Sequence, residues 1–245
     1  MEMTFGGHLE EFRKRLLVSL AAIGAAALFC FFYVDEILGV LIAPIRPQIG
    51  QIYFFSPTEA FVIKVKAALL AALVIASPLV VCQLWLFLSP GMYAREKKAA
   101  FFVVFLISFL FAAGALFSFA AVLPMALNFL IGQQTEYLRP LVSMSEYLGF
   151  LTGMVIAFGF AFNFPVFVTA LVAAGVVRVK TLNLYQRHIA VFIFIAAAVL
   201  TPGPDIASQL LLAFPLVLLF ALGVAGAKVI EIFKNTASSC PETGR

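Results

Sequence analysis

Long apolar runs that are almost free of charge constrain this chain more than any other feature. The first, Leu16–Val34, contains no charged residue, and about 20 apolar residues are enough for a helix to cross a bilayer. Hydrophobic residues make up 64% of the 245 positions and charged residues 11%, whereas a soluble domain is about half apolar and about a quarter charged. We therefore predict an all-α integral membrane protein. Its six transmembrane helices are expected at residues 16–34, 58–82, 96–123, 146–174, 184–199 and 205–227.

The whole chain, 1–245, is expected to form a single transmembrane domain with a disordered tail at 235–245. The first run exceeds the usual core of a signal peptide, which is about 7–15 residues, so we expect it to be a retained span. The last two spans are joined by the tight turn Thr201–Asp205. They should form a short hairpin, because the apolar run Ile189–Leu200 covers only about 18 Å of a hydrocarbon core that is about 30 Å thick.

Lysine and arginine residues gather on one side of the predicted bundle and orient it. Six spans place both termini on the same side, and cytoplasmic loops carry an excess of these cations. Both termini are therefore predicted to be cytoplasmic. The cations on that side are Arg13, Lys14, Arg15, Arg95, Lys97, Lys98, Arg178, Lys180, Arg187, Lys228 and Lys234, against Arg46, Lys64, Lys66 and Arg139 on the other.

One connecting stretch, Gln83–Ala99, differs from an ordinary loop. Trp85 and Phe87 suit a membrane interface, and Pro90-Gly91 breaks the helix. Three cations then surround a single acid, Glu96. We expect the rest of the chain to hold this loop at one face of the membrane.

The N-terminal segment is the second charged stretch. A helix from about His8 would carry two ion pairs at i,i+4 spacing, Glu10 with Lys14 and Glu11 with Arg15. Two capping-box patterns, Ser56–Glu59 and Ser143–Glu146, are expected to begin the second and fourth spans. Pro124 should kink or end the third span, and a second external loop is expected at 128–141.

Five stretches, in order along the chain, resemble one known family. They are HLEEFRKRL at 8–16, FSPTEAF at 55–61, QLWLFLSPGMYAREK at 83–97, FGFAFNFPV at 158–166 and LTPGPDIASQLLLAFPL at 200–216. The family is TatC, the multispanning subunit of the twin-arginine protein translocase (the Sec-independent protein translocase). The resemblance extends over nearly the whole chain, and five motifs in order are far more specific than any one of them.

The resemblance implies a function in protein export rather than catalysis. TatC proteins form the membrane receptor that binds twin-arginine signal peptides of folded cargo at the cytoplasmic face. They act with TatA- and TatB-type single-span subunits, in a larger complex where homo-oligomers are expected, and transport is driven by the protonmotive force. The implied location is the inner (cytoplasmic) membrane of a prokaryote. No cofactor, metal or catalytic residue is expected, and no nucleic acid.

Specific residues match the family's binding surface. Glu11 and Arg13 match the N-terminal motif, and the loop motif supplies a further three. The chemistry of the ligand agrees, because the planar fork of a guanidinium pairs bidentately with a carboxylate, and Glu10, Glu11 and Glu96 are the acids expected nearest that surface. The expected signal-peptide-binding residues are Glu10, Glu11, Arg13, Phe87, Pro90 and Glu96.

Each of these residues also has a purely structural interpretation. Glu96 could cap the third span, where the helix dipole favours a negative group. Glu11 could be only the i,i+4 partner of Arg15. Arg13 could only enforce the topology, and Phe87 could be only an interface anchor.

Asn163, in the middle of the fourth span beside Pro165, departs from the family pattern, which usually has Glu there. A polar group inside the membrane is a functional hypothesis by default. The alternative is a hydrogen bond between helices near the kink, where proline frees a carbonyl. A second family acid is replaced by Ala221, so neither position can carry a charge.

The start of the last span holds two further candidates. Asp205 is placed to cap that helix, while Gln209 lies in a region that the family associates with contact to a partner subunit.

Two other classes of protein were weighed against a receptor. A small secondary transporter would use a midplane polar site, and Asn163 with Pro165 marks one broken-helix candidate. An intramembrane enzyme would need a nucleophile and a base on facing spans, and the sequence shows no such constellation. The three cysteines have wide spacings that predict neither a disulfide framework nor a metal site.

Overall fold

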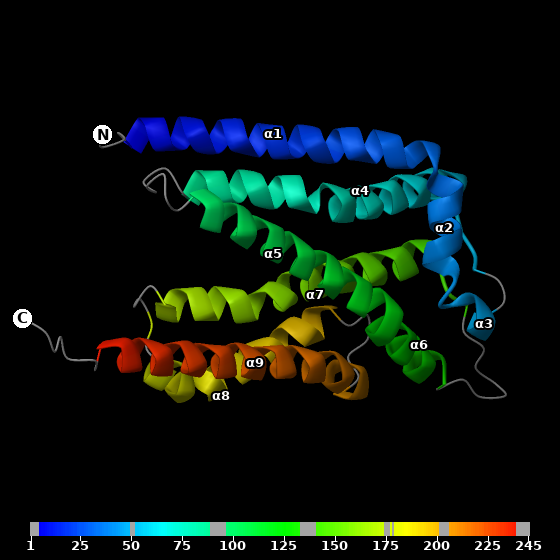
Figure 1. Cartoon of the computed structure of the whole chain (residues 1–245). Coiled ribbons are helices and arrows are strands. Elements are labelled where there is room, and N and C mark those ends of the chain that lie inside the picture. The colour runs from blue at the N-terminus through cyan, green and yellow to red at the C-terminus, as the bar shows by residue number, and fades with distance from the viewer. Residues whose placement is uncertain are drawn as a thin grey trace, which may run out of the picture.

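The chain folds as a bundle of long helices (Figure 1). The computed structural model describes residues 5–49, 52–88, 97–132, 141–173, 177, 179–200 and 206–238, with some side chains inside these ranges left out. The described part contains no strand, and its one isolated bridge pairs Tyr53 with Ser143. The long helices are α1 (Phe5–Phe32), α4 (Pro57–Leu88), α5 (Lys97–Phe117), α7 (Met144–Ala173), α8 (Val179–Leu200) and α9 (Ile206–Ser238). The short elements are α2 (Val34–Ile42), α3 (Arg46–Ile49), the π-helical turn η1 (Ser118–Val122) and α6 (Leu123–Ile131).

Five helical segments in the described residues are long and apolar enough to cross a membrane. They are Leu9–Phe32, Pro57–Leu84, Val104–Ile131, Met144–Val172 and Leu212–Val229, and the most buried of the five has only 39% of its apolar window inside the protein. Such helices have apolar side chains facing outward as well as inward, which suits a lipid environment. The prediction of an all-α, multi-pass membrane protein is thus confirmed, while the sixth crossing stays a prediction.

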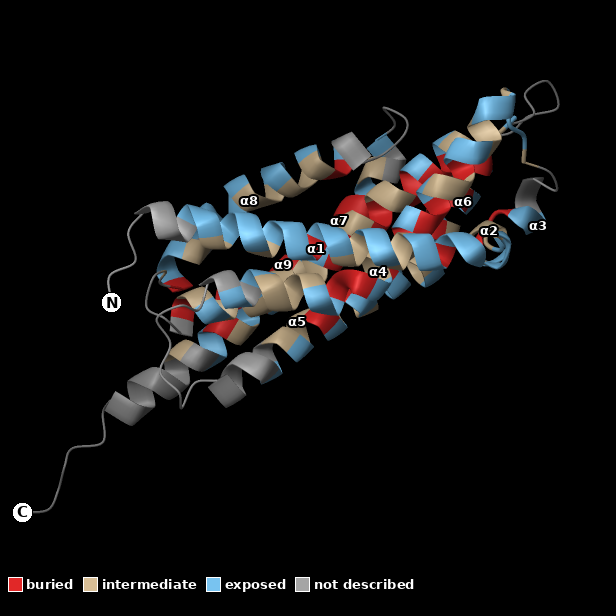
Figure 2. Cartoon of the chain, turned by 90° about the horizontal axis from the view of Figure 1, so that it is seen from above, coloured by how far each residue is buried: buried red, intermediate tan, exposed pale blue. Residues whose placement is uncertain are grey.

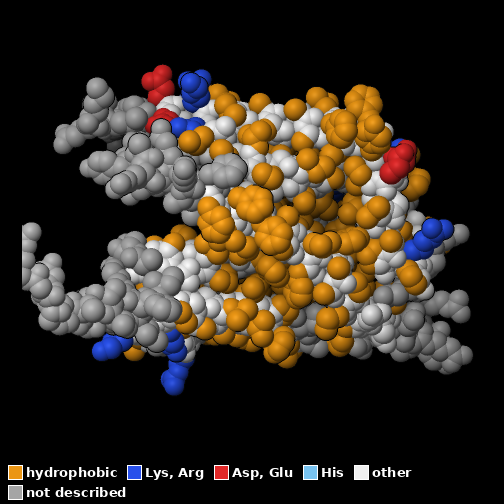
Figure 3. All heavy atoms as spheres, viewed as in Figure 1, with side chains coloured by type: hydrophobic (Ala, Val, Ile, Leu, Met, Phe, Trp, Pro, Cys, Tyr) orange, Lys and Arg blue, Asp and Glu red, His pale blue; other side chains and the backbone are white. Residues whose placement is uncertain are grey.

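Charged side chains lie toward the two ends of the molecule, and apolar side chains cover the middle (Figure 3).

The sixth apolar segment, Leu184–Ala198 of α8, is shorter than the other five. At about 1.5 Å per residue it covers about 22 Å, less than the hydrocarbon core of about 30 Å. The segment can cross only if flanking polar residues enter the interface or the bilayer thins locally.

The helices pack in a chain of neighbours. α1 lies on α4, α4 on α5, α5 on α7, α7 on α9, and α9 on α8. α1 begins and α9 ends at the same end of the bundle, which we call the terminal end, and α2 and α3 lie at the opposite end, the α2 end (Figure 1). This arrangement is consistent with both termini lying on one side of a membrane. That this side is cytoplasmic stays a prediction.

The buried core runs along α7 and the helices that cross it (Figure 2). Leu148, Leu151, Met154 and Phe158 of α7 are at most 1% exposed. Glycines let the neighbours approach: a Cβ on Gly114 of α5 would lie 2.4 Å from the carbonyl oxygen of Phe158. Gly223 of α9 packs on Pro165 of α7 in the same manner. Small residues at such crossings are typical of membrane helix packing.

Pro124 bends the third span without ending it. The turn before it opens into the π-helix η1, in which the N–H of Leu123 donates to the carbonyl oxygen of Ser118, and α6 then continues to Ile131. The prediction that an external loop begins at residue 128 is therefore wrong, because Asn128–Ile131 is helical. Leu127 and Ile131 are buried in the bundle, and this packing favours the helix over the break that a proline would otherwise cause.

Polar contacts at the α2 end join α2 and the start of α4 to the start of α7. Glu59, in the first turn of α4, accepts hydrogen bonds from the N–H of Phe55 at 2.7 Å and from the Ser143 hydroxyl at 2.9 Å. The Tyr147 hydroxyl donates to the carbonyl oxygen of Leu41 at 2.6 Å. Glu59 thus reaches back to the N–H of Phe55, one residue before the Ser56 N–H that a capping box would use, and it also binds a residue 84 positions away.

Ser77 compensates for a proline inside α4. Pro78 has no N–H to donate to the carbonyl oxygen of Val74, four residues earlier. The Ser77 hydroxyl donates to that oxygen at 2.8 Å, and the Ser77 side chain is only 5% exposed. A buried carbonyl that the proline would leave unpaired is therefore satisfied by the residue beside it.

We expect Ser77→Ala to lower the free energy of unfolding by about 1–2 kcal/mol, because it leaves a buried carbonyl without a donor. Ser108→Ala is the matched control: Ser108 is equally buried and donates to the carbonyl oxygen of Val104 at 2.8 Å, but that oxygen also has the N–H of Ser108 as its helical donor. Thermal unfolding in detergent measures both variants. Equal losses would contradict this account of Ser77.

Candidate functional site

An ion pair between Glu11 and Arg15 marks the terminal end of α1. Arg15 donates to one oxygen of Glu11, Oε1, through both Nε at 3.1 Å and Nη2 at 2.5 Å. The Glu11 side chain is 20% exposed and the Arg15 side chain is 22% exposed. The pair forms because the residues are four positions apart on a helix, which places them on the same face. The predicted Glu11–Arg15 pair is confirmed.

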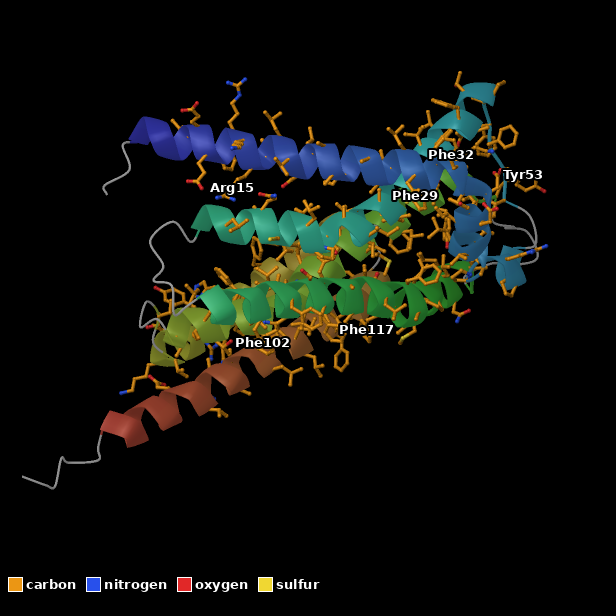
Figure 4. All side chains as sticks on the ribbon, turned by 45° about the horizontal axis from the view of Figure 1, so that its top comes forward. Arg15, Phe29, Phe32, Tyr53, Phe102 and Phe117 are labelled. Carbon is orange, nitrogen blue, oxygen red and sulfur yellow. The ribbon has the colours of Figure 1, made fainter. Side chains whose placement is uncertain are left out.

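The pair also contacts the neighbouring helix. Arg15 Nη1 lies 3.5 Å from Oε1 of Gln83, near the end of α4, and the Arg15 side chain is on the face of α1 that points toward α4 (Figure 4). The sequence did not predict a role for Gln83. An amide in the last turns of an otherwise apolar helix was the only signal that could have pointed to it.

The second oxygen of Glu11 is available as an acceptor. Glu11 Oε2 is buried and has no hydrogen-bond partner in the part of the chain that the structure describes. An ionised carboxylate can accept about four hydrogen bonds, and Arg15 uses only one of its two oxygens. The site therefore has unused capacity for a further donor, and a guanidinium or an ammonium group would supply one.

The neighbouring charges are less constrained. Glu10, Arg13 and Lys14 are exposed, and no ion pair joins the described side chains of Glu10 and Lys14, so that predicted pair is wrong. Both side chains extend into solvent, where an ion pair contributes little. Glu11 is thus the predicted acid of this segment that the structure holds in place.

Other predicted residues of this surface lie outside the described part. Pro90 and Glu96 fall in the undescribed stretch 89–96. Trp85 and Phe87 belong to α4, but their side chains are not among those described. α4 ends at Leu88 and α5 begins at Lys97, and both of these helix ends are at the terminal end with Glu11 (Figure 1). The two described residues that flank the stretch with Glu96, Leu88 and Lys97, therefore lie at the end of the bundle where Glu11 lies.

Among the described residues, the Asn163 side chain makes no hydrogen bond to another helix and none to the carbonyl that Pro165 frees. Its Nδ2 donates to the carbonyl oxygen of Gly159, one turn earlier in α7, at 2.9 Å. Pro165 lacks the N–H for Ala161, not for Gly159, so the helix–helix hydrogen bond expected as an alternative is wrong for this donor. The Oδ1 of Asn163 is buried without a partner among the described residues.

Gln209 links the last two helices. Its Nε2 donates to the carbonyl oxygen of Phe194 at 2.9 Å, which holds α9 against α8 in the predicted hairpin. Asp205 lies outside the described residues, so its capping role stays a prediction. The described residues hold no cluster of three or more His, Cys, Asp or Glu side chains that could bind a metal ion.

Comparison with known proteins identifies the family. The family model for Sec-independent protein translocase protein (TatC) matches residues 7–215. A TatC protein of Carboxydothermus hydrogenoformans is 34% identical over 229 residues, covering 94% of each chain. One from Aquifex aeolicus is 37% identical and covers 89% of this chain and 91% of its own.

Structural comparison gives the same answer. A crystal structure of the twin-arginine translocase receptor TatC superposes with a TM-score of 0.82 at 33% identity, covering 91% of this chain and 99% of the other. A second TatC crystal structure, determined in the detergent DDM, gives a TM-score of 0.80. The family match over residues 7–215 includes Glu11 and Arg15 of α1 and the stretch between α4 and α5. This chain therefore belongs to the TatC family of Sec-independent protein translocase proteins, and it is a multi-pass membrane component of protein transport.

Proposed function

We propose that this protein is the receptor subunit that binds twin-arginine signal peptides of folded proteins at the cytoplasmic face of the membrane. The observation that carries the proposal is the Glu11 carboxylate at the terminal end. Arg15 orients it, while Oε2 has no hydrogen-bond partner among the described residues. A peptide guanidinium is the donor that best fits a carboxylate of this kind, because its N–H groups form a planar fork. Glu96 supplies a second acid on the stretch that joins α4 to α5.

Recognition at this surface depends on placed hydrogen bonds rather than on a broadly negative potential. Several exposed cations lie at the same end of the bundle, including Arg13, Lys14, Lys180 and Lys228. These charges repel a cationic peptide over a screening length of about 8–10 Å. A peptide that carries arginine must therefore gain its binding energy at short range, from the carboxylates themselves.

The proposed export step requires partners and a driving force. In this account TatA- and TatB-type single-span subunits assemble with the chain, with more than one copy of it in the complex, and the protonmotive force drives transport. Asn163 and Ala221 cannot be protonated or deprotonated, so proton coupling does not run through these two positions. Gln209 already donates to Phe194; a partner subunit that contacts it would use its remaining amide groups.

Site-specific crosslinking tests the binding surface. A photoreactive aromatic residue in place of Phe87, which keeps both Glu11 and Glu96, should capture a twin-arginine peptide, and the same peptide with two lysines should be captured far less. The reason is that an ammonium group forms point contacts and cannot pair bidentately with a carboxylate. Capture of both peptides alike, or capture only from positions at the α2 end, would contradict the proposal.

A small secondary transporter with a polar site near Asn163 is the alternative function. Family membership does not support it, and the Asn163 amide donates within its own helix. Uptake of a small solute by vesicles that contain the purified protein would favour this alternative over a receptor.

A further inference from the structure

The Glu11–Arg15 pair is unusual in how the arginine uses the carboxylate. Nε and Nη2 of Arg15 both donate to Oε1, at 3.1 and 2.5 Å, and neither reaches Oε2. A guanidinium binds a carboxylate most strongly when its two N–H groups each take a different oxygen. The internal arginine therefore holds Glu11 in a geometry that a second, freely oriented guanidinium could improve.

From this we propose that Arg15 is an internal competitor for the ligand: it occupies the Glu11 carboxylate in the free receptor, and the arginine of an incoming peptide displaces it. The inference depends on the proposed function and adds a residue that sets the affinity. Arg15 presents the same chemical group as the ligand, to the same carboxylate, from within the chain.

The structure shows how Arg15 can leave without losing all of its contacts. Its side chain remains 22% exposed, so the displaced guanidinium can be hydrated. Its Nη1 is already 3.5 Å from Oε1 of Gln83, at the long limit of a hydrogen bond, and a displaced side chain can shorten that contact. The two side chains are 22% and 20% exposed, so breaking the pair costs more than breaking a fully exposed ion pair. The incoming guanidinium offsets that cost because it pairs with the same carboxylate.

A competitor and a positioning residue make opposite predictions for the same variant. If Arg15 competes, its removal frees Glu11 and strengthens peptide binding. If Arg15 only orients Glu11, its removal lets the carboxylate move and weakens binding. Lys14→Gln is the control for the loss of one positive charge. Lys14 lies next to Arg15 in sequence, is exposed, and forms no ion pair with Glu10, its described i,i+4 neighbour.

The test measures binding of a fluorescent twin-arginine peptide to the purified full-length protein in detergent. We expect Arg15→Gln to bind about two- to five-fold more tightly than Lys14→Gln, the fold-change that corresponds to loss of a weak ion pair. Arg15→Lys keeps the charge but lacks the fork, and it should bind more tightly than the wild type by a smaller factor. Arg15→Lys also allows the binding test to be made if Arg15→Gln does not fold.

Either of two results would overturn the inference. Arg15→Gln could bind no more tightly than Lys14→Gln, which would make Arg15 a bystander, or more weakly, which would make it a positioning residue. Failure of the proposed function looks different, because the wild type would then bind twin-arginine and twin-lysine peptides equally.

Discussion

Glu11→Gln weakens binding of a twin-arginine peptide by about 10- to 100-fold. The substitution preserves the shape of the side chain but removes its charge, and a hydrogen bond to a charged group contributes about 1.5–3 kcal/mol. Folding should be little affected, because the Glu11–Arg15 pair is partly exposed and contributes about 1 kcal/mol or less. Equilibrium binding to the purified protein measures the change.

Two comparisons make this result specific. Glu10→Gln should reduce binding less than Glu11→Gln does, because Glu10 is exposed and no described side chain forms an ion pair with it. Glu231→Gln removes one negative charge from α9 at the same end of the bundle, and it should leave binding unchanged. If all three variants weaken binding equally, the effect is one of net charge and Glu11 has no special part.

Gly114→Ala should lower the free energy of unfolding by about 1–3 kcal/mol or more. A Cβ at this position would lie 2.4 Å from the oxygen and 2.9 Å from the carbon of the Phe158 carbonyl. Both atoms belong to the backbone of α7, so the clash cannot be relieved by turning a side chain, and the helices have to separate. The loss of α5–α7 packing appears as a lower temperature of thermal unfolding.

Gly149→Ala is the matched control for this prediction. Gly149 lies in α7, and a Cβ there would meet no atom within 4 Å. Alanine should stabilise the protein at this position by about 1 kcal/mol or less, because it has the higher helix propensity. The two glycine-to-alanine changes are thus expected to have opposite signs, and destabilisation by both would contradict the proposed close approach at Gly114.

Local patterns in the sequence were enough to predict most of the helices. The capping-box pattern Ser56–Glu59 was enough to predict that a helix begins there, and α4 begins at Pro57. The spacing of Glu11 and Arg15 was enough to predict their ion pair. Both features depend on residues within one or two turns of each other. Helical periodicity and i,i+4 contacts report such neighbours directly.

Contacts between distant segments were not predictable from the sequence. Ser143 donates to Glu59 across 84 positions, and Arg15 reaches Gln83 across 68. These pairs depend on which helices become neighbours, and periodicity alone does not determine that. Asn163 illustrates a different limit: its position predicted a polar group inside the membrane, but only the structure shows that its amide donates to Gly159.

The most direct test of the central claim compares two peptides that differ only in the paired residues, two arginines or two lysines, for binding to the purified wild-type protein. The account predicts that the arginine peptide binds at least about ten-fold more tightly, because only a guanidinium can pair bidentately with a carboxylate such as Glu11. Equal affinity for the two peptides would contradict it.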